Sequence, residues 1–160
     1  MVSAEQLMDV VRDYLDSQEW NYDYDAERNL LRSGLNIKNR MKSVKIYVST
    51  RDGILQSYFV SAVSGDTNEY TELLKFLNYA NWNMTSGNFE FDPSDGEIRF
   101  RYTVRMGDIT ETPESLAVAA IVLPAMMYEK YGDSIATLAF GFSNAEDEIA
   151  KIKKAEEEEE

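Results

Sequence analysis

Arg99, Arg101 and Arg105 lie two and four positions apart, so they share one face of a predicted strand. Guanidinium groups bind carboxylates in a bidentate manner, and this stripe can therefore hold an anionic ligand or an acidic segment of a partner protein. The alternative is cross-strand ion pairing with Glu90 and other neighbouring acids, which contributes about 0.2–1 kcal/mol per pair.

Two further groups of side chains can bind a partner. Trp20, Tyr22 and Tyr24 alternate with polar residues and can form a peptide-binding platform, although such alternation is more typical of side chains that face a core. Met126 and Met127 are adjacent on a predicted helix, so one of them must point away from the core. That residue can line an adaptable hydrophobic groove or form a dimer contact.

Most catalytic chemistry is excluded by composition, because the chain contains neither cysteine nor histidine. This removes thiolate nucleophiles, Ser-His-Asp and Cys-His catalysis, Cys-based zinc sites and imidazole-ligated haem or metals. The pairs Asp23/Asp25 and Asp92/Asp95 have the spacing of neither an EF-hand nor a located acid–base pair, so we expect turn and surface roles for them. We therefore predict a non-enzymatic protein without cofactor or metal.

Charge restricts the partners further. The chain has 16 basic and 29 acidic residues, a formal net charge of −13, which argues against nucleic acid and anionic membrane surfaces. Residues 146–160 carry eight acids and three lysines, a net charge of −5. The N-terminus has no basic-then-apolar signal and no apolar run approaches the roughly 18 residues of a membrane span, so a soluble, cytoplasmic protein is expected.

The elements that position the arginine stripe lie at residues 70–104. The segment YTELLKFLNYANW predicts a helix over 70–82, capped by Asp66 or Thr67 with Glu69 completing a capping box. Its expected buried stripe is Tyr70, Leu73, Leu74 and Leu77. The segment TSGNFEFDPSDGEIRFRYTV then predicts an antiparallel hairpin that turns at 92–96. Its inward faces are expected to be Phe89 and Phe91, and Ile98, Phe100, Tyr102 and Val104.

The preceding residues predict a helix followed by strands. A capping box of Ser3 and Gln6 opens a helix over 4–17. Apolar alternation then predicts three strands, beginning at Trp20, around Leu31 with Gly34 at a bulge, and through Val44, Ile46 and Val48. A turn at 51–53 leads into a strand over 54–63 whose two faces are both partly apolar. Such a strand is covered on each side or borders an interface.

The residues after the hairpin predict helices. Thr112 and Pro113 begin one, and its expected buried stripe is Leu116, Ala119, Ala120 and Leu123. Pro124 is expected to kink or split this helix, with Gly132 as the C-cap of its second part and a short helix following over 134–140. A capping box at 143–146 opens a last helix, which is expected to lose order in the acidic run Glu156–Glu160.

The segment LLKFLNYANWNMTSGNFEFDPSDGEIRFRYTV resembles the central signature of the YbjN family of bacterial proteins. The shared features are a leucine-rich helix, an Asn-containing exit, a Gly before a strand, an acidic Gly turn and an arginine-bearing strand, in which Arg101 matches best. The likeness covers roughly residues 3–142, and the acidic tail departs from it. It implies the α+β fold shared with type III secretion chaperones, α-β(3-4)-α-ββ-α with an antiparallel sheet and additional C-terminal helices.

The resemblance and the composition together predict a chaperone-like or regulatory module. We expect one domain over 1–142, followed by a C-terminal helix and acidic tail over 143–160. The module would recognise another polypeptide through its sheet or a helix-flanked groove, as a homodimer. The alternative is a small-ligand or anion-binding sensor that uses the strand Arg99–Arg105.

Overall fold

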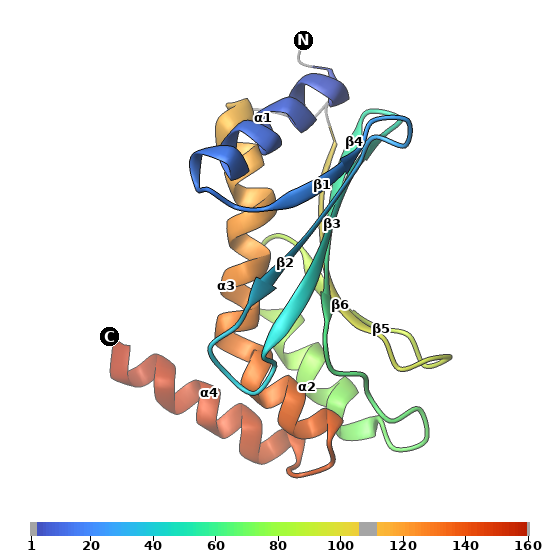
Figure 1. Ribbon diagram of the computed structural model, residues 1–160. Helices are drawn as coiled ribbons and strands as arrows, with labels where there is room; N and C mark the ends of the chain where they lie inside the picture. The colour runs from blue at the N-terminus through green and yellow to red at the C-terminus, as the bar shows by residue number, and fades with distance from the viewer. Residues whose placement is uncertain (1–2, 106–111, 160) are drawn as a thin grey trace.

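The computed structural model describes residues 3–105 and 112–159 and arranges them in a sheet and a layer of helices (Figure 1). The elements are α1 (Ala4–Ser17), β1 (Tyr22–Asp25), β2 (Leu30–Asn36), β3 (Ser43–Arg51), β4 (Ile54–Ser61), α2 (Thr71–Trp82), β5 (Asn88–Phe91), β6 (Ile98–Arg105), α3 (Pro113–Ala139) and α4 (Ala145–Glu159). This order confirms the predicted α+β architecture.

The strands form one antiparallel six-stranded sheet in the order β1-β2-β3-β4-β6-β5. Residues that lie opposite each other in an antiparallel pair share a face, so the register determines which side chains point toward the helices. The buried inward-facing residues include Leu31, Val44, Ile46, Val48, Leu55, Phe59, Phe89, Ile98, Phe100 and Tyr102. Helices α1 and α3 pack on the central strands and α2 packs on β5, whereas α4 packs on α2 and α3.

The N-terminal half follows the prediction except at two points. The capping box of Ser3 and Gln6 begins α1 as expected. Gly34 does not form a bulge, because it pairs with Lys45 in an unbroken register. Trp20 lies before β1, and its indole Nε1 donates a hydrogen bond to the Gly34 carbonyl oxygen at 3.0 Å.

Helix α2 differs from the prediction in its start and its buried stripe. It begins at Thr71 with no side-chain cap, since the Asp66 carboxylate accepts a hydrogen bond from the Asn68 N–H in a local turn. The predicted cap is therefore wrong. The buried residues are Leu73, Phe76, Leu77 and Ala80. Leu74 is 40% exposed, because the helix is rotated so that Phe76 takes the central buried position.

Helix α3 is continuous through Pro124 and Gly132, so the predicted split and the predicted C-cap are wrong. Both residues are buried, and packing on either side outweighs the local loss of helix propensity. A Cβ at Gly132 would lie 3.2 Å from the Met41 Cβ, so glycine permits the β2–β3 loop to approach the helix. The helix ends at Ala139, and Gly141, two residues later, has a φ of +73°.

Helix α4 begins one residue later than predicted and remains ordered further. Asn144, not Ser143, is the cap, and its Oδ1 accepts from the Asp147 N–H at 2.9 Å. The helix continues to Glu159, contrary to the expectation that the acidic run is disordered. One reason is that Glu156 pairs with Lys130 of α3 at 2.6 Å.

Substitution of Gly96 in the β5–β6 turn tests how closely the hairpin packs against Gly65. Gly96 and Gly53 both have positive φ, +80° and +74°, but only a Cβ at Gly96 would collide with the Gly65 carbonyl oxygen. We expect Gly96→Ala to lower the free energy of unfolding by more than about 2 kcal/mol, and Gly53→Ala by about 1 kcal/mol. Urea denaturation measures both. Equal losses would contradict the close contact.

Substitution of Glu148 tests how α4 is attached to α3. It is buried and accepts hydrogen bonds from Ser134 Oγ at 2.8 Å and Lys151 Nζ at 2.7 Å. Burial opposes its charge, but these bonds and one from Ser143 outweigh burial and hold its pKa below the ordinary value. A depressed pKa contributes stability above the unfolded-state value of about 4.5, and this contribution is lost as pH falls through the folded value.

We therefore expect Glu148→Gln to lower the free energy of unfolding by about 1–3 kcal/mol at neutral pH. The variant should then lose less stability than the wild type as pH falls below about 4.5. Urea denaturation across the acid range measures this difference. A variant with the same pH dependence as the wild type would show that Glu148 is not held as a charged group.

Candidate interaction surface

One side of the sheet, the outer face, is free of helices within the described residues (Figure 1). The side chains of the outer face point away from the helices, and all of them are half-buried or exposed. The outer face consists of Asp23, Asp25, Leu30, Arg32, Asn36, Ser43, Lys45, Tyr47, Ser49, Arg51, Ile54, Gln56, Tyr58, Val60, Asn88, Glu90, Arg99, Arg101, Thr103 and Arg105.

Strand β4 shows the difference between the two faces. Its inward residues Leu55 and Phe59 are fully buried, whereas its outward residues Tyr58 and Val60 are half-buried. Within the described residues β4 is therefore covered on one side, and the expectation of two covered sides is wrong. That β4 borders an interface stays a prediction.

A row of tyrosines and arginines crosses the outer face. Tyr47 of β3 lies directly opposite Tyr58 of β4. The row continues with Arg32 opposite Tyr47 on β2 and Arg101 opposite Tyr58 on β6. The Arg99 guanidinium stacks on the Tyr58 ring, 4.5 Å from the ring centroid, in the geometry of a cation–π contact.

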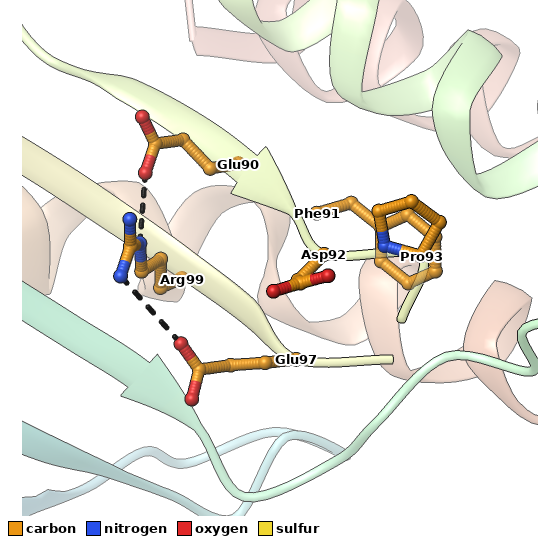
Figure 2. Close-up of a pocket in the computed structure, with 6 residues that line it drawn as sticks. All are labelled: Glu90, Phe91, Asp92, Pro93, Glu97 and Arg99. Atoms are coloured by element: carbon orange, nitrogen blue, oxygen red, sulfur yellow. Dashed lines mark hydrogen bonds and ion pairs between the residues drawn. The ribbon is translucent and has the colours of Figure 1, made fainter. Parts of the chain in front are cut away.

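Glu90 connects two of the predicted arginines. Its carboxylate accepts from Arg99 Nε at 2.7 Å and lies 2.8 Å from Arg101 Nη2. On the other side, Glu97 Oε1 lies 3.8 Å from Arg99 Nη1. Arg99 is therefore placed between two carboxylates (Figure 2). Partial burial lowers the pKa of Arg99, but the hydrogen bond and charge of Glu90 outweigh burial and leave it raised. Cross-strand pairing is thus present for both arginines.

A hollow of about 490 Å³ lies beside this cluster at the end of the hairpin (Figure 2). Its lining is Glu90, Phe91, Asp92, Pro93, Glu97 and Arg99. Three carboxylates against one guanidinium make it a poor anion site. Asp92 is used by the turn, because hydrogen bonds from Ser94 Oγ and N–H lower the pKa of its carboxyl.

The other predicted binding residues lie elsewhere. Tyr22 points to the helix-covered side of β1, and it and Trp20 are half-buried against the core. On α3, Met126 is 54% exposed whereas Met127 packs partly against the core, as expected for an adjacent pair. Arg105 is exposed at the end of β6. The structure therefore brings the three arginines together on one strand but does not join them to the other residues.

Sequence reasoning missed the part of the outer face that β2 and β3 supply. Arg32, Lys45 and Tyr47 alternate with the buried residues of these strands. The same alternation that identified Val44, Ile46 and Val48 as inward therefore placed Lys45 and Tyr47 outward. The pattern in the sequence therefore predicts the outward residues as well as the buried ones.

Neither metal-binding nor membrane-spanning features occur in residues 3–105 and 112–159. No group of three or more His, Cys, Asp or Glu side chains there is arranged so that it could hold a metal ion, and none of the helices has the length and hydrophobicity of a membrane span. Asp23 pairs with Arg32 at 3.1 Å and Asp25 pairs with Arg28 at 3.7 Å, which confirms surface roles for these acids.

Comparison with known families gives one match. Residues 8–119 match the model of the YbjN family, described as "Putative bacterial sensory transduction regulator". The match includes the helix, the hairpin and the arginine-bearing strand. The chain belongs to the YbjN family. No curated protein matches the sequence.

Solved structures with a similar fold include two that each cover most of this chain. The crystal structure of YbjN from E. coli, described as "a putative transcription regulator", has a TM-score of 0.54 and 11% identity, covering 79% of this chain and 92% of that one. The crystal structure of the ExsC–ExsE complex contains a chain with a TM-score of 0.50 and 13% identity, covering 81% and 96%. The fold implied by the resemblance to YbjN proteins and type III secretion chaperones is confirmed.

Glu90 also allows a test of the arginine cluster. We expect Glu90→Gln to lower the free energy of unfolding by about 1 kcal/mol, because it loses charge pairing with two half-buried arginines. The control Glu97→Gln should lose less than about 0.5 kcal/mol, since its single contact is long. Urea denaturation at low and high salt measures both variants. A loss at Glu97 equal to that at Glu90 would contradict the central role of Glu90.

Proposed function

We propose that this YbjN-family protein is a non-enzymatic, chaperone-like or regulatory module that binds another polypeptide through the outer face of its sheet. The main support is that one whole side of a six-stranded sheet is free of helices within the described residues. Side chains on that side include aromatic, aliphatic and basic residues among the polar ones. Exposed surface of this kind on a sheet is typical of interaction sites.

The composition of the outer face supports a protein partner. Tyrosine and arginine are enriched among the residues that contribute most to binding at interfaces. Tyr47 and Tyr58 occupy the centre of the face with Arg32 and Arg101 on either side. A shallow surface with a central aromatic pair fits a polypeptide better than a small substrate, which requires a concave pocket.

One of the two similar structures supports this proposal, because it is named as a complex of two proteins, ExsC and ExsE. A homodimer is a second part of the proposal, and its support is the exposure of Trp82 and Leu74 on one side of α2, at 84% and 40%. Such a dimer would use the helices and leave the outer face available.

The alternative of an anion-binding sensor has less support. Arg99 and Arg101 already share the Glu90 carboxylate, and the nearby hollow has three carboxylates in its lining. An added small anion would have to displace Glu90 from both arginines. An extended partner can instead contact the face at several other points.

The test is capture of a partner by the wild type and by two variants. We expect the wild-type protein to retain one recurrent polypeptide from a native lysate, and the double variant Tyr47→Ala with Tyr58→Ala to lose at least 90% of it, about a tenfold effect. Phe142→Ala is the control, because it removes an aromatic side chain that is 80% exposed and lies outside both the outer face and the proposed dimer contact. Circular dichroism and thermal unfolding establish that each variant is folded.

The opposite result would contradict the proposal. If the tyrosine variant retained the polypeptide and Phe142→Ala lost it, the partner would bind the helical side. If no polypeptide recurred across salt conditions, the protein would not be a binding module of this type.

A further inference from the structure

Charge is distributed unequally between the outer face and the rest of the molecule. The outer face holds six of the 16 basic residues and three of the 29 acidic residues, a net charge of +3. The remaining residues have 10 basic and 26 acidic side chains, a net charge of −16. The outer face is thus a basic surface on a strongly acidic protein.

The three acids of the outer face are already paired. Glu90 is held by Arg99 and Arg101, Asp23 by Arg32, and Asp25 by Arg28 of the β1–β2 turn. Within the described residues, no acid lies in ion-pair range of Lys45, which is exposed on β3. Arg51 and Arg99 also pair with Asp52 and Glu97, which lie just beyond the strand ends. Within residues 3–105 and 112–159, the positive charge of the surface that is not neutralised by an ion pair is therefore that of Lys45 and Arg105.

Positive and apolar groups on the outer face are interleaved. Arg32 and Arg101 lie three strands apart in one row, which places their backbones about 14 Å from each other. Tyr47 and Tyr58 lie between them. In the neighbouring row Val60 separates Lys45 from Arg99. A complementary ligand would carry negative groups separated by apolar ones.

We propose that the occupant of the outer face is an acidic segment of another polypeptide, with carboxylates spaced along it and apolar side chains between them. This inference rests on the proposed function and specifies the partner. The carboxylates pair with Lys45 and Arg105, which have no ion-pair partner within the described residues, and the apolar residues pack on Tyr47, Tyr58 and Val60. The acidic remainder of the protein repels such a segment and so directs it to the sheet.

Two other occupants fit less well. A nucleic acid presents a dense row of phosphates, and the outer face interrupts its cations with Asp23, Asp25 and Glu90. A second copy of the chain has a different surface available in the proposed dimer, the side of α2 that exposes Trp82 and Leu74, and that contact leaves the outer face free.

The experiment uses a labelled peptide that alternates glutamate with leucine, and a lysine–leucine peptide of equal length. Fluorescence anisotropy measures binding to the wild type, to Lys45→Glu with Arg105→Glu, and to the control Lys153→Glu with Lys154→Glu. Both variants change net charge by the same amount. The control lysines lie on α4, in the helical layer.

We expect the wild type to bind the acidic peptide more tightly than the basic one, and binding to weaken in about 1 M salt, where the Debye length is about 3 Å. The outer-face variant should bind the acidic peptide about tenfold more weakly, and the control variant within about twofold of the wild type. Equal weakening in both variants, tighter binding of the basic peptide, or no binding of the acidic peptide would overturn the proposal.

Two further measurements distinguish the other occupants. Tighter binding of inorganic polyphosphate than of the acidic peptide would identify a phosphate-binding face. Self-association that Lys45→Glu with Arg105→Glu abolishes in analytical ultracentrifugation would identify a second copy. If a captured polypeptide required Tyr47 and Tyr58 but tolerated the outer-face charge reversals, the proposed function would stand and this inference would fail.

Discussion

The packing of α3 against the inner face of the sheet is the interaction on which the rest of the structure depends, and Tyr128 is at its centre. Tyr128 is fully buried, and its hydroxyl donates to the Phe59 carbonyl oxygen at 2.8 Å and contacts Ser61 Oγ at 2.9 Å. Its ring packs edge-on against Phe89. A buried hydroxyl without these partners would cost about 1–3 kcal/mol, so these hydrogen bonds favour this position of the helix over others. Because α1, α2 and α3 all lie on this side, the other side stays uncovered (Figure 1).

The uncovered side has a defined arrangement of side chains, and this is why we assign binding to it. Glu90 holds Arg99 and Arg101 in place, and Arg99 in turn packs on Tyr58. Side chains that are ordered before binding lose less conformational entropy when a partner arrives. The ion pairs that weaken the case for a small-anion site therefore strengthen the case for a protein interface.

Alternating hydrophobicity predicted the strands and the outward direction of the arginines, since a period of two is unambiguous in VKIYV and IRFRYTV. The buried side of α2 was harder to predict. Apolar residues lie on several sides of this helix, and either Leu74 or Phe76 fits the helical period of 3.6 residues. Pro124 and Gly132 predicted breaks from local propensity, but tertiary packing keeps α3 continuous. The row from Arg32 to Arg101 could not be predicted, since it requires β6 to lie beside β4, a pairing that no local pattern records.

The central claim is that this protein works by contact through the outer face. Hydroxyl-radical footprinting, read by mass spectrometry, tests it most directly when the isolated protein is compared with its complex with the captured partner. Our account predicts that Tyr47 and Tyr58 are labelled in the isolated protein and protected in the complex, while Trp82 and Met126 keep their labelling. Unchanged labelling at both tyrosines, with protection confined to the helical residues, would contradict it.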